Sequence, residues 1–287
     1  MIKRMESLTV ASNIVSVNWL SENLKNPQVV ILDATMKKMP NGEPIATPKL
    51  KIAGARAFNF DTEICDHQTM LPHMLPSGEQ FELAVRKLGI NQDSIVVCYD
   101  AMGIFSAPRA WWMFKIFGHA KVVVLDGGLP SWIAAGFSTN NDYKPAENTG
   151  NFKSRFNREM VVSMEQVFGL INDETSQVID ARSLGRFNGT EPEPRTGLSG
   201  GHIPNSSCLP FTELLQDGLF KSKPELAKVF SEVVKKESNR LVFSCGSGVT
   251  ASVLALVADE IGYQRLAVYD GSWSEWGANK NLPTASS

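Results

Sequence analysis

Three short apolar segments of this chain occur in the same order in each of its two halves. The pairs are Val29–Asp33 with Gln177–Asp180, Ile95–Asp100 with Leu241–Cys245, and Val122–Asp126 with Leu266–Asp270. Each segment is rich in branched apolar residues and ends at an acidic residue or a cysteine, as buried strands that lead into functional loops often do. The duplicated order predicts that the chain folds as two similar domains.

A helical pattern lies between the second and third strand-like run of each half. The two segments are residues 107–117 and 251–261, and they are followed by Gly118 and Gly262. Glycine at this place suits the left-handed conformation that ends many helices. Strands that alternate with helices of this length predict a parallel sheet covered on both faces. We therefore expect an α/β fold of two domains, each a mainly parallel, doubly wound sheet with helices on both faces.

The boundary between the two domains is expected in a polar segment near the middle of the chain. Asn140–Asn151 includes Pro145 and Gly150 and follows neither the helical nor the strand hydrophobic period. We predict a first domain over residues 8–140, a linker over 141–160 and a second domain over 161–284. A chain of 287 residues is long enough for two cores of this size.

Charge and cysteine content exclude several classes of function. The formal net charge is −2, so we expect neither a nucleic-acid partner nor a membrane partner. The 4 cysteines form no Cys-x-x-Cys pair, which disfavours a zinc site or a disulfide framework and favours a reducing compartment. No stretch is long and apolar enough to cross a bilayer, and no apolar run follows Lys3 and Arg4. The sequence therefore predicts a cytoplasmic protein.

Cys245 is the strongest candidate for chemistry. It follows directly on a strand-like run and begins a glycine-containing loop, Cys245–Thr250, that opens a helix. Consecutive backbone N–H groups in such a loop form an anion-binding nest, and the helix N-terminus adds partial positive charge. Both effects favour the thiolate form, which is the reactive nucleophile. Asp100 stands at the corresponding position of the first half, so we expect only the second half to be reactive.

The chain resembles the two-domain rhodanese family through several motifs. In the second half these are Cys245–Thr250, Asp180–Phe187, Pro192–Arg195, Gly201–Pro204 and Asp270–Trp276. In the first half, Pro72–Pro76 and Ser106–Trp112 match the domain of that family that lacks the cysteine. The resemblance implies two rhodanese-like domains, of which the one over residues 161–284 is catalytic.

The resemblance also implies a reaction. Family members of this kind are sulfurtransferases that carry sulfur as a cysteine persulfide, here on Cys245, and need no metal or organic cofactor. Members that prefer thiosulfate place Arg and Lys after the cysteine, whereas this chain has Gly246 and Ser247. Its neutral loop suits 3-mercaptopyruvate, a monoanion that would be released as pyruvate. The acceptor would be cyanide, a small thiol or a thioredoxin-type dithiol.

Substrate-binding residues follow from the same resemblance. Arg186 and Arg195 are expected to hold the substrate carboxylate, since guanidinium groups can form bidentate hydrogen bonds to it. The loop residues expected to contact the substrate and the transferred sulfur are Gly246, Gly248, Val249 and Thr250.

The family also uses a proton relay at the cysteine. Ser247 is expected to take part in protonating the pyruvate enolate, with His73 and an acid of the first domain completing the relay. Glu63 best fits the family spacing before His73, and Asp61 and Asp66 are the alternatives.

One departure from the family pattern lies in the second half. The family sequence His-Ile-Pro-Gly-Ala becomes His202–Ser206 here, with Asn205 in place of the glycine, and its first-half counterpart is reduced to Lys51–Ala55. Asparagine tolerates a positive φ better than most residues do. We therefore expect a local adjustment at Asn205 and no loss of activity.

Other functions are less compatible with the sequence. Cysteine phosphatases need an arginine six positions after the cysteine, where this chain has Ala251. A non-catalytic binding module would explain the first half but not the joint presence of Cys245, Arg186 and Arg195. Thiosulfate sulfurtransferase is the alternative within the enzyme class. Structural roles are expected for the other three cysteines, Cys65, Cys98 and Cys208.

Overall fold

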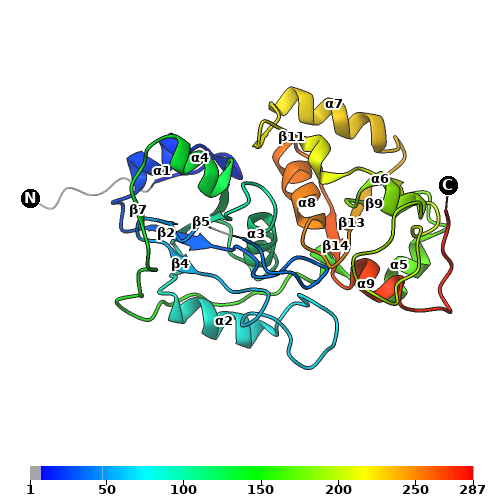
Figure 1. Cartoon of the computed structure of the whole chain (residues 1–287), viewed down its shortest axis with the longest axis horizontal. Coiled ribbons are helices and arrows are strands. Elements are labelled where there is room, and N and C mark those ends of the chain that lie inside the picture. The colour runs from blue at the N-terminus through cyan, green and yellow to red at the C-terminus, as the bar shows by residue number, and fades with distance from the viewer. Residues whose placement is uncertain (1–7, 47, 287) are drawn as a thin grey trace, which may run out of the picture.

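The protein, seen in a computed structural model that describes residues 8–46 and 48–286, is built on two parallel five-stranded sheets (Figure 1). The first sheet consists, in spatial order, of β1 (Ile14–Val15), β6 (Val122–Leu125), β5 (Ile95–Tyr99), β2 (Val29–Asp33) and β4 (Arg56–Ala57). The second consists of β8 (Val161–Val162), β14 (Leu266–Tyr269), β13 (Arg240–Ser244), β9 (Ser176–Asp180) and β10 (Ser207–Cys208). The expected duplication and the α/β fold class are confirmed.

Helices flank both sheets. Those of the first half are α1 (Val17–Asn23), α2 (Gly78–Lys87), α3 (Ala107–Ile116) and α4 (Gly128–Ala134). Those of the second half are α5 (Met164–Leu170), α6 (Leu184–Asn188), α7 (Lys223–Val233), α8 (Ala251–Glu260) and α9 (Ser272–Trp276). Among the described residues, none of these helices has the length and hydrophobicity that crossing a bilayer demands.

Short elements complete the fold. Two are single 3-10 turns, η1 (Arg158–Met160) and η2 (Phe211–Leu214). Two small antiparallel pairs join β3 (Lys51–Ile52) to β7 (Thr139–Asn140) and β11 (Leu215–Gln216) to β12 (Leu219–Phe220). They lie outside the two large sheets, whose strand pairs are all parallel.

The central strands are mostly apolar, as suits strands that are covered by helices on both faces. In β2, Leu32 belongs to the core that includes residues of α2 and α3, whereas Ile31 belongs to the core that includes residues of α1 and α4. In β13, Phe243 lies in the core with α7 and α8, and Val242 in the core with α5 and α9. Alternate side chains of one strand thus enter opposite cores, as the pleat of a strand requires.

Local signals in the sequence set the helix ends. The segments predicted at 107–117 and 251–261 form α3 and α8, and the glycines that follow them, Gly118 and Gly262, have φ values of 86° and 97°. The left-handed conformation predicted for both glycines is therefore confirmed. Asn205 has a φ of 62°, and its side chain Nδ2 donates a hydrogen bond to the carbonyl of Ile171. Asparagine thus adopts the backbone conformation that the family's glycine would provide.

The segment expected to link the domains runs along the first one. Phe152 is fully buried and packs edge-on against Phe81 of α2, with ring centroids 5.9 Å apart. The Gly150 N–H donates to the carbonyl of Arg86 at 2.8 Å. This part of the chain therefore adds to the first core, and the domain limits given above stay a prediction.

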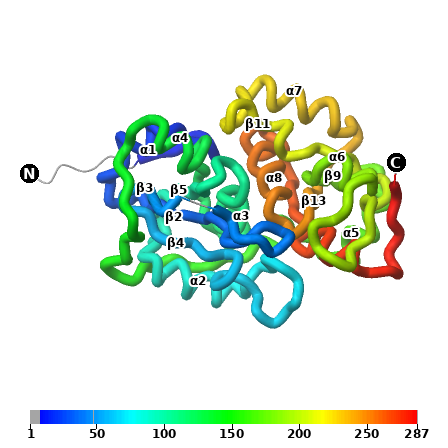
Figure 2. Tube along the Cα trace, in the orientation of Figure 1, coloured from blue at the N-terminus to red at the C-terminus, as the bar shows by residue number. Residues whose placement is uncertain are grey.

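The two domains meet where α3 packs against α8 (Figure 2). Nearly every residue of both helices is buried, and one of these residues, Arg109 of α3, carries a charge with no solvent exposure. Its Nη2 donates to Oδ1 of Asp270 at 2.6 Å, and its guanidinium lies 4.7 Å from the ring centroid of Trp112. Asp270 follows β14, so a side chain of the first domain is fixed inside the second.

Replacing Arg109 with methionine is expected to lower the free energy of unfolding by about 3–5 kcal/mol, because Asp270 would keep a buried charge without its partner. Urea unfolding of the full chain measures this change. The control is Lys144→Met, which breaks the exposed Lys144–Glu147 pair and should cost less than about 1 kcal/mol. Equal costs for the two variants would show that the buried pair does not stabilise the folded chain.

Candidate active site

Cys245 lies at the carboxyl end of β13, where the chain turns into α8. Cys245 is buried, with a solvent exposure of only 1%. The beginning of α9 holds the loop from behind: the Cys245 N–H donates to Oγ of Ser272 at 3.2 Å, and the Ser274 N–H donates to the carbonyl of Gly246 at 2.9 Å. These bonds fix the path of the backbone on both sides of the cysteine.

Gly248 allows the two domains to approach at this loop. Its φ is 76°, and a Cβ there would lie 3.0 Å from both Nη1 of Arg109 and the carbonyl oxygen of Asp270. A side chain would therefore strain the backbone and push against the buried ion pair. The glycine expected to contact substrate thus also serves the contact between the domains.

The loop after Cys245 presents backbone N–H groups that have no acceptor in the described part of the chain. This holds for the N–H groups of all five residues 246–250. The matching loop of the first domain shows what such groups can bind. There Oδ2 of Asp100 accepts hydrogen bonds from the N–H groups of Phe105, Ser106 and Ala107 at 3.0, 2.9 and 2.8 Å. Asp100 thus fills its own loop, whereas the loop of Cys245 can receive an anion.

Arg186 and Arg195, the two arginines expected to bind the substrate carboxylate, lie beside this loop. A Cβ on Gly246 would be 3.2 Å from Nη2 of Arg186 and 3.4 Å from Nη1 of Arg195. Arg186 forms an ion pair with Glu193 at 2.7 Å, whereas Arg195 has no carboxylate partner among the residues that the structure describes. Burial lowers the pKa of Arg195, and the nearby Cys245 opposes this shift. Arg195 is thus the guanidinium with its charge available to a bound carboxylate.

A second arginine network holds Arg186 in place. Arg182 is 2% exposed, pairs with Asp180 and with Glu193 at 2.6 Å each, and stacks its guanidinium 4.2 Å from the ring centroid of Trp273. Glu193 therefore bridges Arg182 and Arg186. Asp180 and Arg182 come from the same motif as Arg186, and Glu193 comes from the neighbouring motif Pro192–Arg195.

His73 reaches the cysteine loop from the first domain. Its Nδ1 lies 2.9 Å from Oγ of Ser247, and its carbonyl accepts a hydrogen bond from Arg109. Two residues later, the N–H of Leu75 donates to Oδ2 of Asp270 at 2.8 Å. Burial lowers the pKa of His73 to about 3, and the charges of Arg109 and Arg195 add to this effect. His73 is therefore neutral at physiological pH and can exchange a hydrogen bond with Ser247 in either direction.

The structure does not bring Glu63 to His73. Glu63 is exposed, its Oε1 accepts a hydrogen bond from Nδ2 of Asn59 at 2.8 Å, and it lines a different pocket from Cys245. The cause is a tight turn in which the carbonyl of Asn59 accepts the N–H of Glu63. The alternatives Asp61 and Asp66 accept backbone N–H groups of Lys37 and Gln68, and the ring of His73 has Ser247 as its only hydrogen-bond partner in the described chain.

The sequence did not reveal the acid that does connect to this site. Asp270 ends a repeated strand and begins the motif Asp270–Trp276, and Arg109 lies in the matching motif Ser106–Trp112, but neither pattern marks these residues as partners. A lone arginine within the apolar run Ala107–Ile116 was the available signal, because a charge there must find a buried partner. Its partner could not be identified without the packing of α3 on α8.

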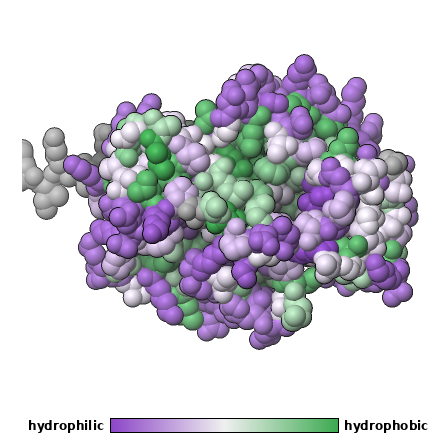
Figure 3. All heavy atoms as spheres, viewed as in Figure 1, coloured by the Kyte–Doolittle hydropathy of each residue, from purple (hydrophilic) through white to green (hydrophobic). Residues whose placement is uncertain are grey.

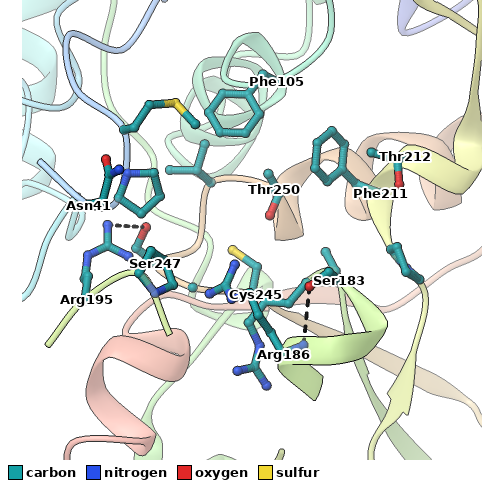
Figure 4. Close-up of a pocket in the computed structure, with 18 of the residues that line it drawn as sticks. Asn41, Phe105, Ser183, Arg186, Arg195, Phe211, Thr212, Cys245, Ser247 and Thr250 are labelled. Atoms are coloured by element: carbon teal, nitrogen blue, oxygen red, sulfur yellow. Dashed lines mark hydrogen bonds between the residues drawn. The ribbon is translucent and has the colours of Figure 1, made fainter. Parts of the chain in front are cut away.

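One cavity of about 370 Å³ joins these groups (Figure 4). The predicted site residues that line it are Arg186, Arg195, Cys245, Gly246, Ser247, Val249 and Thr250. The first domain contributes Met36, Met39, Pro40, Asn41 and Phe105 to its wall. In Figure 4, Cys245 lies between the arginines and the two phenylalanines Phe105 and Phe211. The cavity thus has a cationic side and an apolar side.

The other cysteines differ from Cys245 in their surroundings. Cys98 is in β5 and fully buried, Cys65 is 8% exposed, and Cys208 is half-buried in β10. Burial raises the pKa of each of these three thiols, in the case of Cys208 to about 12. None of the three lines the cavity of Cys245, and all four cysteines are free thiols.

Protonation of His73 predicts how stability depends on pH. The unfolded chain takes up a proton on this group near pH 6.5, whereas the folded chain does so only near pH 3. Unfolding should therefore become easier as pH falls from 7 to 5, and His73 should account for at most about 2 kcal/mol of the loss. Burial lowers the pKa of His119 too, so His119 acts in the same direction.

His73→Gln should remove the part due to His73. His119→Gln is the control at a buried histidine with no contact to the cysteine loop, and it should remove only the part due to His119. Urea unfolding at pH 7 and pH 5 measures both. A pH dependence that is the same in the wild type and in His73→Gln would contradict a buried neutral imidazole at this position.

Comparison with known proteins agrees with the fold and the site. The family model of the rhodanese-like domain matches residues 16–135 and again residues 163–279. The chain is 40% identical over 278 residues to 3-mercaptopyruvate sulfurtransferase of Escherichia coli K12, covering 94% of this chain and 96% of that protein. It is 39% identical to mitochondrial thiosulfate/3-mercaptopyruvate sulfurtransferase 1 of Arabidopsis thaliana, with coverage of 98% and 80%.

Among solved structures, the crystal structure of SseA from Escherichia coli, described as a 3-mercaptopyruvate sulfotransferase, is similar. Its TM-score is 0.79 at 36% identity, with 91% of this chain and 99% of that chain covered. The repeated domain, the cysteine loop and these likenesses lead to one conclusion: the chain belongs to the rhodanese family and contains two rhodanese-like domains.

Proposed function

We propose that this protein is a 3-mercaptopyruvate sulfurtransferase that moves sulfur through a persulfide on Cys245 to a thiol or to cyanide and releases pyruvate. The observation that carries the proposal is the combination of Cys245, a loop of N–H groups with no acceptor among the described residues, and two guanidinium groups on one cavity. The printed names of the Escherichia coli and Arabidopsis relatives include the same donor.

The first step uses the cationic side of the cavity. Arg195, with Arg186 beside it, binds the carboxylate of the donor and directs its sulfur toward Cys245. The Cys245 thiolate attacks that sulfur, a sulfur–sulfur bond forms, and the carbon–sulfur bond breaks. The electron pair of the broken bond passes to pyruvate as its enolate. The N–H groups of the loop stabilise the negative charge of the persulfide.

A proton must then reach the enolate carbon. The donor loses its thiol proton when its sulfur becomes the anionic end of the persulfide, and pyruvate gains one proton, so the step balances. Ser247 is placed to transfer it, since its Oγ lies 2.9 Å from Nδ1 of His73 and 3.4 Å from Nη2 of Arg195. The neutral His73 can accept the hydroxyl proton and return it. We leave Glu63 out of this relay, because its carboxylate bonds Asn59.

The choice of donor follows from the charge of the loop. Gly246 and Ser247 carry no charge. The cavity is lined by Arg186, Arg195 and Arg182, and the charge of Arg182 is already paired with Asp180 and Glu193. This suits a donor with one negative charge. Thiosulfate, a dianion, is the alternative donor, and the printed name of the Arabidopsis relative includes it.

A cytoplasmic location and a thiol acceptor complete the proposal. The four free cysteines are consistent with a reducing compartment. Such a compartment contains small thiols and thioredoxin-type dithiols, both of which can accept sulfur from a persulfide. The acceptor persulfide then reacts with a second thiol outside the protein, which gives a disulfide and releases sulfide.

Cys245→Ser tests the proposed function. The wild type incubated with 3-mercaptopyruvate should gain the mass of one sulfur atom and release pyruvate, and both should be lost in Cys245→Ser because the hydroxyl cannot carry the sulfur. Intact-mass spectrometry and a pyruvate assay measure the two outcomes. Cys208→Ser, in the same domain but outside the cavity, is the matched control and should retain both.

Thiosulfate is assayed beside 3-mercaptopyruvate with one shared thiol acceptor. Turnover of thiosulfate equal to or faster than that of 3-mercaptopyruvate would replace the proposed donor with the alternative. A wild type that gains no sulfur from either donor would refute sulfur transfer altogether.

Loop charge can be tested separately from loop size. Gly246→Arg with Ser247→Lys adds two cations, and Gly246→Gln with Ser247→Met adds side chains of similar length without charge. Relative to the uncharged variant, the charged one should raise the ratio of thiosulfate to 3-mercaptopyruvate turnover by about tenfold, the effect of one charge-assisted hydrogen bond. Steady-state kinetics with both donors measure this ratio. Identical ratios in the two variants would show that loop charge does not set donor preference.

A further inference from the structure

We propose that the apolar side of the Cys245 cavity is a subsite for the acceptor, and that it selects thiols with an apolar body. The proposal rests on the proposed function, because it needs the Cys245 persulfide. The apolar side of the cavity consists of five residues, called here the acceptor wall: Met36, Met39, Pro40 and Phe105 of the first domain and Phe211 of the second.

An aromatic pair between the domains forms the centre of the acceptor wall. Phe105 precedes α3, Phe211 begins η2, and their ring centroids are 5.9 Å apart at an interplanar angle of 62°. Both residues are half-buried, so part of each ring borders the cavity. In Figure 4 the two rings lie above Cys245, whereas Arg186 lies below it and Arg195 lies to its left. A molecule entering the cavity therefore meets apolar surface opposite the cations.

A hairpin of the first domain supplies the rest of the wall. Its backbone is held by hydrogen bonds from Met39 N–H to the carbonyl of Glu43 and from Ile45 N–H to the carbonyl of Lys37, at 2.8 and 3.0 Å. Met36, at its base, is 3% exposed. Methionine side chains adapt to ligands of different shape, as an acceptor site for several thiols requires. Figure 3 shows hydrophobic residues gathered on this face, between the two halves of the molecule.

Binding of the donor, 3-mercaptopyruvate, does not require the apolar surface of the acceptor wall. A keto acid with a carboxylate group is bound by charge and hydrogen bonds, which the arginines and the loop supply. The cavity of about 370 Å³ is of the size that holds drug-like molecules, and 3-mercaptopyruvate has only a few heavy atoms. Apolar surface on the wall gains binding energy only when an apolar ligand displaces water from it. The acceptor is the reactant that remains to use this surface.

The second half-reaction then balances without an added oxidant or reductant. The acceptor thiolate attacks the outer sulfur of the persulfide, and a new sulfur–sulfur bond forms. The bond between the two sulfurs on Cys245 breaks, and its electron pair stays on Cys245 as thiolate. The outer sulfur leaves as the persulfide of the acceptor, with its proton or its negative charge unchanged.

The test is a series of acceptors that differ only in apolar length. With saturating 3-mercaptopyruvate, kcat/KM is measured for ethanethiol, propanethiol and butanethiol, whose thiol acidities are similar. Burial of each added methylene group on the acceptor wall should raise kcat/KM by about fourfold. A value that does not change along the series in the wild type would overturn the proposal.

Variants assign the dependence on chain length to the wall. In Phe105→Ala and in Phe211→Ala the increase should fall to about twofold or less per methylene group, whatever happens to the absolute rate, because roughly half of the buried apolar contact is lost. Phe105→Leu keeps apolar surface and should keep most of the increase. The matched control is Phe168→Ala in α5, where the side chain is exposed and outside the cavity. A full increase in both alanine variants would also overturn the proposal.

Failure of this subsite can be told apart from failure of the proposed function. Intact mass shows whether 3-mercaptopyruvate charges Cys245. If it does and chain length has no effect, the acceptor wall alone is refuted. If it does not, the proposed donor is refuted, and the same series is run after charging the protein with inorganic polysulfide, so that the wall is still judged by its own dependence on chain length.

Discussion

The ion pair of Arg109 with Asp270 fixes the geometry of the site, because it joins the domains at the loop that carries the cysteine. Arg109 also bonds the carbonyl of His73, and Asp270 also accepts the N–H of Leu75. Two charges removed from water are tolerated because each finds further polar partners. One buried contact therefore sets the distance between the histidine loop and the cysteine loop, and with it the hydrogen bond from which the proposed proton relay begins.

Because of this contact, both domains contribute residues to the site. The second domain provides Cys245 and both arginines, and the first provides His73 and most of the apolar wall. Neither domain alone forms the cavity. The cysteine-free half thus closes the site of the other half, and the buried helix α3 packs against α8 to connect them.

Features encoded in short stretches of chain could be predicted from the sequence, and those that depend on packing could not. The apolar runs that became β5 and β13, and the glycine-containing loop of Cys245, are local patterns, and each is found where it was expected. Arg186 and Arg195 also reached the cavity, since their motif adjoins the loop in space. Their assigned roles, like those of the other site residues, stay predictions.

Glu63 shows the opposite case. Spacing along the chain suggested it, but the turn at Asn59 directs its carboxylate away from His73. The contact of Phe105 with Phe211 likewise depends on how α3 docks on the second domain, which no local pattern encodes.

Asp100 has a meaning beyond its role in the first core. An aspartate and a cysteine persulfide have the same number of bonds between Cα and the terminal atom, so Oδ2 of Asp100 is the counterpart, in bond count, of the outer sulfur of a persulfide. Three N–H groups already converge on that oxygen. The first domain thus carries, as a genetically encoded residue, a side-chain oxygen bound by loop N–H groups in the way proposed for the outer sulfur of a Cys245 persulfide.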